Sequence, residues 1–243
     1  MSEACDVTET ASALVQDSPL LEVDEEQIFC GYCRDLAGLK RNSRVLEIGC
    51  GWGSLAKALA TNLNEEGCYR GIDIVEEKIQ WCRQRSTSPN FSFQRVDVVN
   101  RNYNPMGRVL ASQFRLPFKD ESFDLVILRS VFTVMTAEEA QPYLSEIARV
   151  LVKGGRCLIT FFLLNDESRR LLAINQIRDF KYCWGVCSTE GADGTHAVAY
   201  DEAYVKVAFL INGLSVREPI YYGSWCGRES RWYSQDMVIA RKV

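Results

Sequence analysis

The sequence predicts an α/β fold: a seven-stranded, mostly parallel, doubly wound sheet with helices on both faces and an antiparallel last strand. Two observations predict this class. Short apolar runs typical of buried strands alternate with segments of helical periodicity, as they do where parallel strands are joined by right-handed crossovers. Near the end of the chain, two strand-like runs follow each other without a helix between them, so we expect them to pair antiparallel.

The expected elements follow from these patterns in chain order. Helical periodicity begins at Asp24 and brings Ile28, Tyr32, Leu36 and Leu39 near one face. Further helices are expected over residues 54–63, 76–85, 137–151 and 203–211. Strands are expected over residues 44–48, 69–72, 91–96, 124–128, 156–163, 215–222 and 236–241.

Proline and glycine add two expectations about the helix over residues 137–151. Pro142 is expected in its first turn or at a kink, because proline has no N–H to donate within a helix. Gly154 and Gly155 are expected to end this helical region and to turn the chain into the next strand.

The chain is expected to consist of a flexible tail over residues 1–20 and a single domain over residues 21–243. The tail is polar and shows no periodicity. Within the domain we expect an N-terminal helical lid at about residues 21–40 and an aromatic insertion at about residues 165–202. Such inserts follow strands where open α/β sheets build binding sites. The insertion is interpreted either as an apolar lid over an acceptor or as a helical cap packed on the sheet.

Composition limits the function classes. Apolar residues make up 47% and charged residues 25% of the chain, and the net charge is −4, so no electrostatic footprint for nucleic acid is evident. The N-terminus lacks the basic start and apolar stretch of a signal peptide. The longest apolar run, over residues 158–164, is too short to cross a bilayer. We therefore expect a cytoplasmic protein without nucleic-acid or membrane partners.

The ten cysteines are irregularly spaced. Cys30 and Cys33 form the only C-x-x-C pair, and no second pair stands at the spacing of a zinc site. Several cysteines lie in apolar runs, as Cys157 does, where a free thiol packs as a small hydrophobe. Reduced, structural cysteines are therefore expected, and no metal.

The segment from Glu47 to Gly53 carries the clearest chemical pattern. An acidic residue ends a buried strand, glycines stand at positions 49, 51 and 53, and a helix follows at once. The glycines permit positive φ and close approach of a ligand to the backbone, beside a helix N-terminus. Ser54 stands where a dinucleotide fingerprint has its third glycine, and Glu47 would repel a pyrophosphate. S-adenosylmethionine fits better, because it carries an ammonium and a sulfonium group.

With this segment the chain resembles the Rossmann-like (class I) S-adenosylmethionine-dependent methyltransferases, over roughly residues 44–163. That family's first loop has an acidic residue followed by three alternating glycines. The resemblance implies that Asp73 binds the ribose hydroxyls and that Asp97 lies near the adenine amine. Taken singly, each carboxylate could equally cap a helix. The cofactor-binding residues expected are Glu47, Gly49, Cys50, Gly51, Gly53, Asp73, Ile74, Asp97, Val98 and Arg129.

The general base is the least defined part of the expected site. The cofactor supplies the electrophile, so the protein has mainly to position and desolvate the acceptor, although a neutral hydroxyl also needs a base. Val134 stands near the position where many members of the family carry a histidine. The only histidine, His196, lies in the aromatic insertion and is the candidate catalytic base. A surface position for His196, proton loss to solvent and an acceptor of low pKa stay open as alternatives.

Candidate acceptor contacts come from several segments. Trp225 and Arg228 are placed to hold a planar or polyol acceptor, or else to anchor the turn before the last strand. Tyr32, on the first helix, is a candidate to close over the cofactor. The Asn-Pro-Pro-Tyr motif of many amine methylases is absent after the fourth strand, and no carboxylate cluster for a metal follows it. The acceptor-binding candidates are Tyr32, Val134, Trp184, Trp225 and Arg228.

Together these features predict an S-adenosylmethionine-dependent methyltransferase that acts on a small molecule, more often at oxygen than at nitrogen or carbon. Two alternatives are kept. One is methylation of a protein or RNA, and the other is a protein that binds S-adenosylmethionine without turnover.

Overall fold

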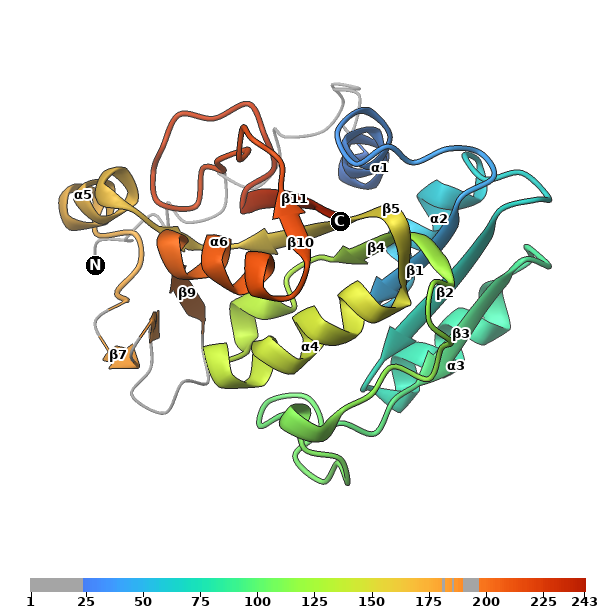
Figure 1. Ribbon diagram of the computed structural model, residues 1–243. Coiled ribbons are helices and arrows are strands. Elements are labelled where there is room, and N and C mark those ends of the chain that lie inside the picture. Colours follow the sequence, from blue (N-terminus) through green and yellow to red (C-terminus); the bar gives the residue numbers. More distant parts are fainter. Residues whose placement is uncertain (1–23, 181, 185, 190–196) are drawn as a thin grey trace, which may run out of the picture.

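The computed structural model describes residues 24–243 apart from 181, 185 and 190–196. A seven-stranded sheet in the order β10-β11-β5-β4-β1-β2-β3 forms its centre (Figure 1). Strand β1 pairs in parallel with β2 and β4, whereas β11 pairs antiparallel with β5 and β10. The predicted fold class is confirmed. The strands of this sheet are β1 (Arg44–Ile48), β2 (Cys68–Asp73), β3 (Phe91–Arg95), β4 (Phe123–Leu128), β5 (Leu151–Phe161), β10 (Leu214–Val216) and β11 (Asp236–Lys242).

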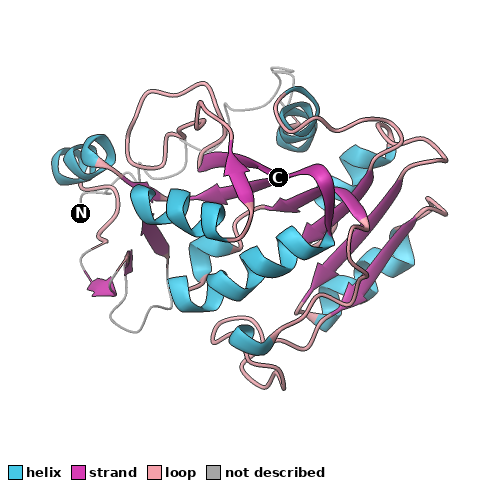
Figure 2. Ribbon diagram, in the orientation of Figure 1, coloured by secondary structure: helices cyan, strands magenta, loops and turns pink. Residues whose placement is uncertain are grey.

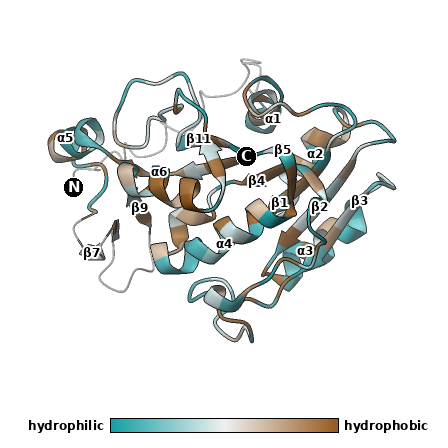
Figure 3. Cartoon of the chain, viewed as in Figure 1, coloured by the Kyte–Doolittle hydropathy of each residue, from teal (hydrophilic) through white to brown (hydrophobic). Residues whose placement is uncertain are grey.

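Helices cover both faces of the sheet (Figure 2). Alternate strand residues point to opposite faces, so Val45 packs in the core under α1, α2 and α3, while Leu46 packs in the core under α4 and α6. The central strands carry mainly hydrophobic residues and the outer side of α3 mainly hydrophilic ones (Figure 3). The helices are α1 (Glu25–Asp35), α2 (Ser54–Ala60), α3 (Glu76–Arg85), α4 (Ala137–Val150), α5 (Asp166–Asn175) and α6 (Glu202–Ile211), with short 3-10 helices η1 (Ala111–Gln113) and η2 (Phe132–Val134).

One local expectation around α4 is wrong. The helix ends at Val150, and β5 begins at Leu151, so Gly154 and Gly155 lie within the strand and do not end the helix. The buried Leu151 pairs with Phe123 of β4, and the register then shifts before the next pair. Gly154 has φ +80° in this irregular stretch, which glycine adopts without steric cost. Pro142 lies inside α4 and not in its first turn, so of its two expected positions only a kink stays a prediction.

The insertion at about residues 165–202 forms more than a helical cap. It contains α5 and three strands of a second, four-stranded sheet in the order β6-β9-β8-β7, which lies at the end of the molecule far from β3 (Figure 1). Ala197 and Ala199 of the insertion share a small core with Phe162, Trp225 and Cys226, whereas Val198 and Tyr200 pack in the core of the main sheet. The strands are β6 (Leu163–Leu164), β7 (Tyr182–Trp184), β8 (Cys187–Thr189) and β9 (Val198–Asp201). No helix in the described part of the chain is long and apolar enough to span a membrane.

Asp236 ties the last strand to the segment before it and to β6. Its fully buried carboxylate accepts hydrogen bonds from the N–H of Gly223 at 2.7 Å, the N–H of Leu163 at 2.8 Å and the indole N–H of Trp225 at 2.7 Å. The Arg228 guanidinium lies 3.4 Å away. Burial raises the pKa of Asp236 to about 6, although these donors oppose the shift.

We expect Asp236→Ala to lower the free energy of unfolding by about 3–5 kcal/mol, because it leaves buried donors and the Arg228 cation without their acceptor. Urea unfolding measures the loss. The matched control is Glu167→Ala, which removes a half-exposed carboxylate 2.9 Å from the same arginine and should cost less than about 1 kcal/mol. Equal losses in the two variants would contradict the structural role of Asp236.

Candidate functional site

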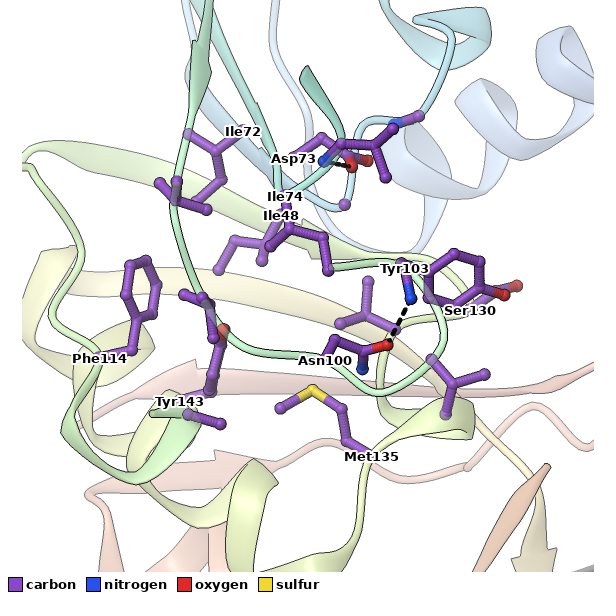
Figure 4. A pocket seen from close by; sticks show the side chains of 18 of the residues that line it. Ile48, Ile72, Asp73, Ile74, Asn100, Tyr103, Phe114, Ser130, Met135 and Tyr143 are labelled. Atoms are coloured by element: carbon purple, nitrogen blue, oxygen red, sulfur yellow. Dashed lines mark hydrogen bonds between the residues drawn. The ribbon is translucent and has the colours of Figure 1, made fainter. Parts of the chain in front are cut away.

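A cavity of about 240 Å³ opens at the carboxyl ends of β1, β2 and β4 and beside the segment that follows β3 (Figure 4). This edge is where parallel α/β sheets bind ligands. Most of its walls are apolar: Ile74 and Phe114 face it from different segments, and Met135 and Tyr143 close it from the α4 side. Of the predicted cofactor-binding residues, the cavity is lined by Gly49, Gly51, Asp73, Ile74, Val98 and Arg129.

The turn between β1 and α2 is built from backbone that only glycine adopts easily. Gly49, Gly51 and Gly53 have φ values of +79°, +54° and +78°. A Cβ on Gly49 would lie 2.4 Å from Cγ2 of Val131, whereas one on Gly51 would meet no protein atom within 4 Å. The side of the turn at Gly51 is therefore open toward the cavity, and a ligand can approach its backbone closely.

Strand β2 holds this turn in place. The N–H groups of Gly49 and Cys50 both donate to the carbonyl of Ile72, at 2.8 and 3.0 Å. Asp73 then accepts from the N–H of Gly51 at 2.8 Å and from the N–H of Val75 at 2.9 Å, one on each carboxylate oxygen. Each oxygen keeps a lone pair for a further donor, so the carboxylate can bind the turn and a ligand hydroxyl together.

Glu47 lies behind the turn and does not line the cavity. Its side chain is fully buried at the end of β1 and accepts a hydrogen bond from the Tyr69 hydroxyl. Burial raises the pKa of this carboxyl to about 7, while the Tyr69 hydrogen bond and the nearby Arg129 cation oppose the shift. A buried carboxyl with this pKa changes its charge readily when a cation arrives near it.

Arg129, at the end of β4, fastens the N-terminal helix to the site. Its guanidinium donates to both carboxylate oxygens of Glu26 on α1, at 2.7 and 2.9 Å, and lies 5.1 Å from the ring centre of Phe29. Paired Arg–carboxylate contacts of this kind are directional and strong. The first helix therefore meets the cofactor edge of the sheet through Arg129.

Ser130 follows Arg129 in a left-handed conformation, with φ +58°, which is uncommon for a residue with a side chain. A hydrogen-bond network holds it. The Ser130 N–H donates to the Thr160 hydroxyl at 2.8 Å, and that hydroxyl donates to Oε1 of Gln235 at 2.6 Å. The Ser130 hydroxyl donates to the same oxygen at 3.2 Å. Residues of β4, β5 and the segment before β11 thus fix the bend beside the cavity.

Other predicted cofactor residues lie outside the cavity lining. Cys50 and Gly53 belong to the turn but face away from the cavity, Gly53 toward Cys82. Asp97 points to its neighbours: it pairs with Arg95 at 2.8 Å and accepts from the amide of Asn104 at 3.3 Å. The predicted contact between Asp97 and adenine therefore stays a prediction without support from the cavity.

Of the predicted acceptor-binding residues, one lines the cavity and others do not. Val134 lines the cavity, whereas Tyr32 packs edge-on against Phe29 and Trp232. Trp225 and Arg228 do not line it. Both bind Asp236, which is the alternative role of anchoring the turn before the last strand. The His196 position and the Trp184 side chain lie outside what the structure describes.

Several cavity-lining residues were not predicted from the sequence. They come from the polar segment after β3, from α3 and from the inner face of α4, and no short motif marks them. The helical spacing of α4 could have indicated Tyr143, because buried residues of that helix face the sheet edge. The unpredicted residues with polar side chains are Lys78, Asn100, Tyr103, Glu139 and Tyr143.

The sheet order, the glycine turn after β1 and the carboxylate at the end of β2 define a Rossmann-like methyltransferase. The family model of the methyltransferase domain matches residues 39–174, more than half of the chain, and this chain belongs to that family. The chain thus carries a methyltransferase domain, in a fold that it shares with S-adenosylmethionine-dependent methyltransferases of known structure. In the described part of the chain, no group of histidine, cysteine, aspartate or glutamate residues is arranged to hold a metal ion.

Similar proteins differ in what their names say they methylate. A phthiotriol/phenolphthiotriol dimycocerosates methyltransferase of Mycobacterium ulcerans is 34% identical over 51% of this chain and 39% of its own length. A fatty-acid O-methyltransferase of Mycolicibacterium smegmatis is 32% identical over 52% of this chain and 38% of its own. A tRNA N(3)-cytidine methyltransferase of Gallus gallus is 26% identical over 74% of this chain and 45% of its own. The chain thus spans less than half of each relative.

Solved structures agree on the fold. The crystal structure of a magnesium protoporphyrin IX methyltransferase from Synechocystis with bound S-adenosylhomocysteine superposes with a TM-score of 0.57. It covers 91% of this chain and 84% of that one at 20% sequence identity. At this identity the likeness concerns the architecture and not the acceptor.

Two alanine substitutions separate folding from cofactor binding at the turn. We expect Gly51→Ala to fold, since its Cβ meets no protein atom. Its free energy of unfolding should fall by only about 1 kcal/mol, the cost of a left-handed conformation in a residue with a side chain. Its affinity for S-adenosylmethionine should fall at least tenfold, because the new methyl group enters the cavity. Gly49→Ala should lose stability as well, because its Cβ collides with Val131. Thermal unfolding and calorimetry measure both. Unchanged affinity in Gly51→Ala would contradict cofactor contact with the turn.

The raised pKa of Glu47 predicts a pH dependence. In the ligand-free protein the folded state holds the Glu47 proton more tightly than the unfolded state. This contribution to stability is therefore complete below about pH 4.5 and is lost as the pH rises through about 7. A cationic cofactor favours the ionised carboxylate, so binding at pH 6 should release a proton and affinity should rise from pH 6 to 8. Calorimetry in buffers of different ionisation enthalpy tests this. The control is Glu47→Gln, and an identical pH profile in that variant would exclude Glu47 as the titrating group.

Proposed function

We propose that this methyltransferase transfers the methyl group of S-adenosylmethionine to an oxygen atom of a small, largely apolar acceptor. In this assignment Asp73 binds the ribose hydroxyls, and Ile74 and Val98 flank the adenine. The glycine turn receives the methionine end, and the charge of Glu47 favours the cationic cofactor through the low-dielectric interior. Asp97 is left out of the assignment because its carboxylate is paired with Arg95.

The observation that carries the acceptor class is the apolar lining of the cavity, whose described residues include two carboxylates and no histidine. The lining contains the carboxylates of Asp73 and Glu139. Asp73 is engaged by two backbone N–H groups. Glu139 accepts from the N–H and hydroxyl of Thr136 in the cap of α4, at 2.8 and 3.1 Å. Asp73 is assigned to the ribose hydroxyls, and Oε2 of Glu139 is held in the cap of α4, so both carboxylates already have another role.

An acceptor that is already anionic removes the need for a base. A carboxylate oxygen attacks the methyl carbon, an O–C bond forms, and the S–C bond breaks with its electron pair returning to sulfur. The products are a methyl ester and neutral S-adenosylhomocysteine, and no proton moves. The protein then contributes orientation and exclusion of water. A carboxylic acid with an apolar body fits these requirements and the apolar walls formed by Val131, Val134 and Met135.

The names of the relatives favour two different acceptors, a fatty acid and an RNA. One mycobacterial relative is named as a fatty-acid O-methyltransferase, and the match covers 52% of this chain. The tRNA methyltransferase of Gallus gallus matches a larger share of the chain at lower identity, so RNA is the second candidate acceptor. The net charge of −4 favours a small acceptor over a polyanion.

Acceptor assays distinguish these candidates. With saturating S-adenosylmethionine, we expect dodecanoate and hexadecanoate to yield methyl esters, detected by mass spectrometry together with S-adenosylhomocysteine release. Because the carboxylate is already ionised, kcat/KM for the acid should stay within about twofold between pH 7 and 9. The control is Asp73→Ala, which should lose product through weakened cofactor binding. Methylation of tRNA transcripts but not of the fatty acids would overturn the proposed acceptor.

A further inference from the structure

A second cavity lies on the other side of the glycine turn, between α2, α3 and β3. Its volume is about 230 Å³, close to the 240 Å³ of the cofactor cavity, and the two share no lining residue. Gly53 and Trp52 of the turn form one wall, and the end of α3 forms the other. Gly53 belongs to the glycine turn but faces this cavity, and none of Asp73, Ile74, Val98, Val131, Val134 and Met135 lines it.

Two tryptophans stand exposed at its rim. Trp52 is 47% and Trp81 is 42% exposed, although tryptophan usually buries most of its surface. Their ring centres lie 5.5 Å apart with the planes at 80°. Their position leaves ring surface open to solvent where a planar group can stack. Paired exposed aromatic rings beside a cavity are typical of ligand-binding surfaces.

The same cavity is cationic. The Arg85 guanidinium lies 3.3 Å from the ring centre of Trp81, and Lys57 lines the cavity from α2. No ion pair within the described residues joins either cation to a carboxylate, and no aspartate or glutamate lines the cavity. The side chains of Ser86, Thr87 and Ser88 add hydroxyl groups at one end. This cavity therefore offers flat aromatic and guanidinium surfaces, positive charge and hydroxyl donors together.

We propose that this cavity binds a nucleoside 5′-phosphate, either as a free nucleotide or as one unit of a single-stranded nucleic acid. The base stacks on the exposed tryptophan surface and the guanidinium plane, and the phosphate is held by Lys57 and Arg85. Stacking on aromatic and arginine planes beside cations is the recurring mode for unpaired nucleotides. An acidic peptide could pair with the cations, but its carboxylates offer no planar base to stack on the two tryptophan rings. The site is independent of the acceptor proposed above and takes a ligand that is not the cofactor.

The test uses the full chain saturated with S-adenosylhomocysteine, so that the cofactor cavity cannot receive the probe. The probes for calorimetry are AMP, adenosine, inorganic phosphate and a hexaadenylate RNA. We expect AMP to bind one-to-one and more tightly than adenosine or phosphate alone. Trp81→Ala should weaken AMP roughly tenfold through lost stacking, and Trp81→Phe should restore part of it. Lys57→Ala combined with Arg85→Ala should weaken AMP and reduce its salt dependence.

Controls separate binding from folding. Each variant should keep its affinity for S-adenosylhomocysteine within about twofold, because Trp81, Lys57 and Arg85 do not line the cofactor cavity. Arg34→Ala removes an exposed cation elsewhere and should leave AMP binding unchanged. A hexamer that binds at least tenfold more tightly than AMP identifies single-stranded nucleic acid as the source of the nucleotide, and equal affinities identify a free nucleotide. Absence of binding by AMP and the hexamer, binding that Trp81→Ala does not alter, or equal binding of a hexaglutamate peptide would overturn the proposal.

Discussion

The site depends on the hydrogen bonds that tie the glycine turn to the end of β2. One carbonyl, that of Ile72, accepts from two successive turn N–H groups, and Asp73 accepts from a third. These contacts fix three positive-φ glycines in one conformation, so the turn presents open backbone at Gly51 and packed backbone at Gly49. A cofactor that meets a preformed turn loses less affinity to ordering of the protein. Because the turn is held by Ile72 and Asp73, the register between β1 and β2 determines the conformation of the turn that the cofactor meets.

Three charged side chains of alternating sign lie behind that turn. Glu47 lies buried at the end of β1, Arg129 stands at the end of the neighbouring β4, and Glu26 of α1 neutralises Arg129 from outside. Because Arg129 acts on both carboxylates, the position of α1 influences how readily Glu47 ionises. The N-terminal helix thus affects the cofactor end of the site through electrostatics as well as through its packing on α2. A buried carboxylate destabilises the protein when it has no partner and stabilises a cation that is bound beside it.

The sequence predicted the cofactor half of the site because that half is local. Glu47, the three glycines and Asp73 lie at strand ends, where alternating apolar runs locate them, and the bounds of β1 and α3 agree with the structure. The individual lining residues of α4 and of the segment after β3 could not be predicted, since their positions depend on how distant elements pack. The same holds for Trp225 and Arg228, whose residue types suit an acceptor site but whose contacts with Asp236 depend on the position of β11. The small second sheet also escaped prediction, because its strands are short and its β6–β9 pairing joins segments far apart in the chain.

The described lining of the cavity lies wholly within the family match, which spans residues 39–174, and segments beyond the match support it from behind. Gln235, just before β11, holds the strained bend at Ser130, and Trp232 packs against Tyr32 of α1. Methyl transfer places few demands on conserved chemistry, since the cofactor carries the electrophile. The C-terminal segment acts on the site indirectly, through its hydrogen bonds to Ser130 and Thr160 beside the cavity. Proteins similar to this chain carry names for chemically different acceptors, a lipid in one and a tRNA in another.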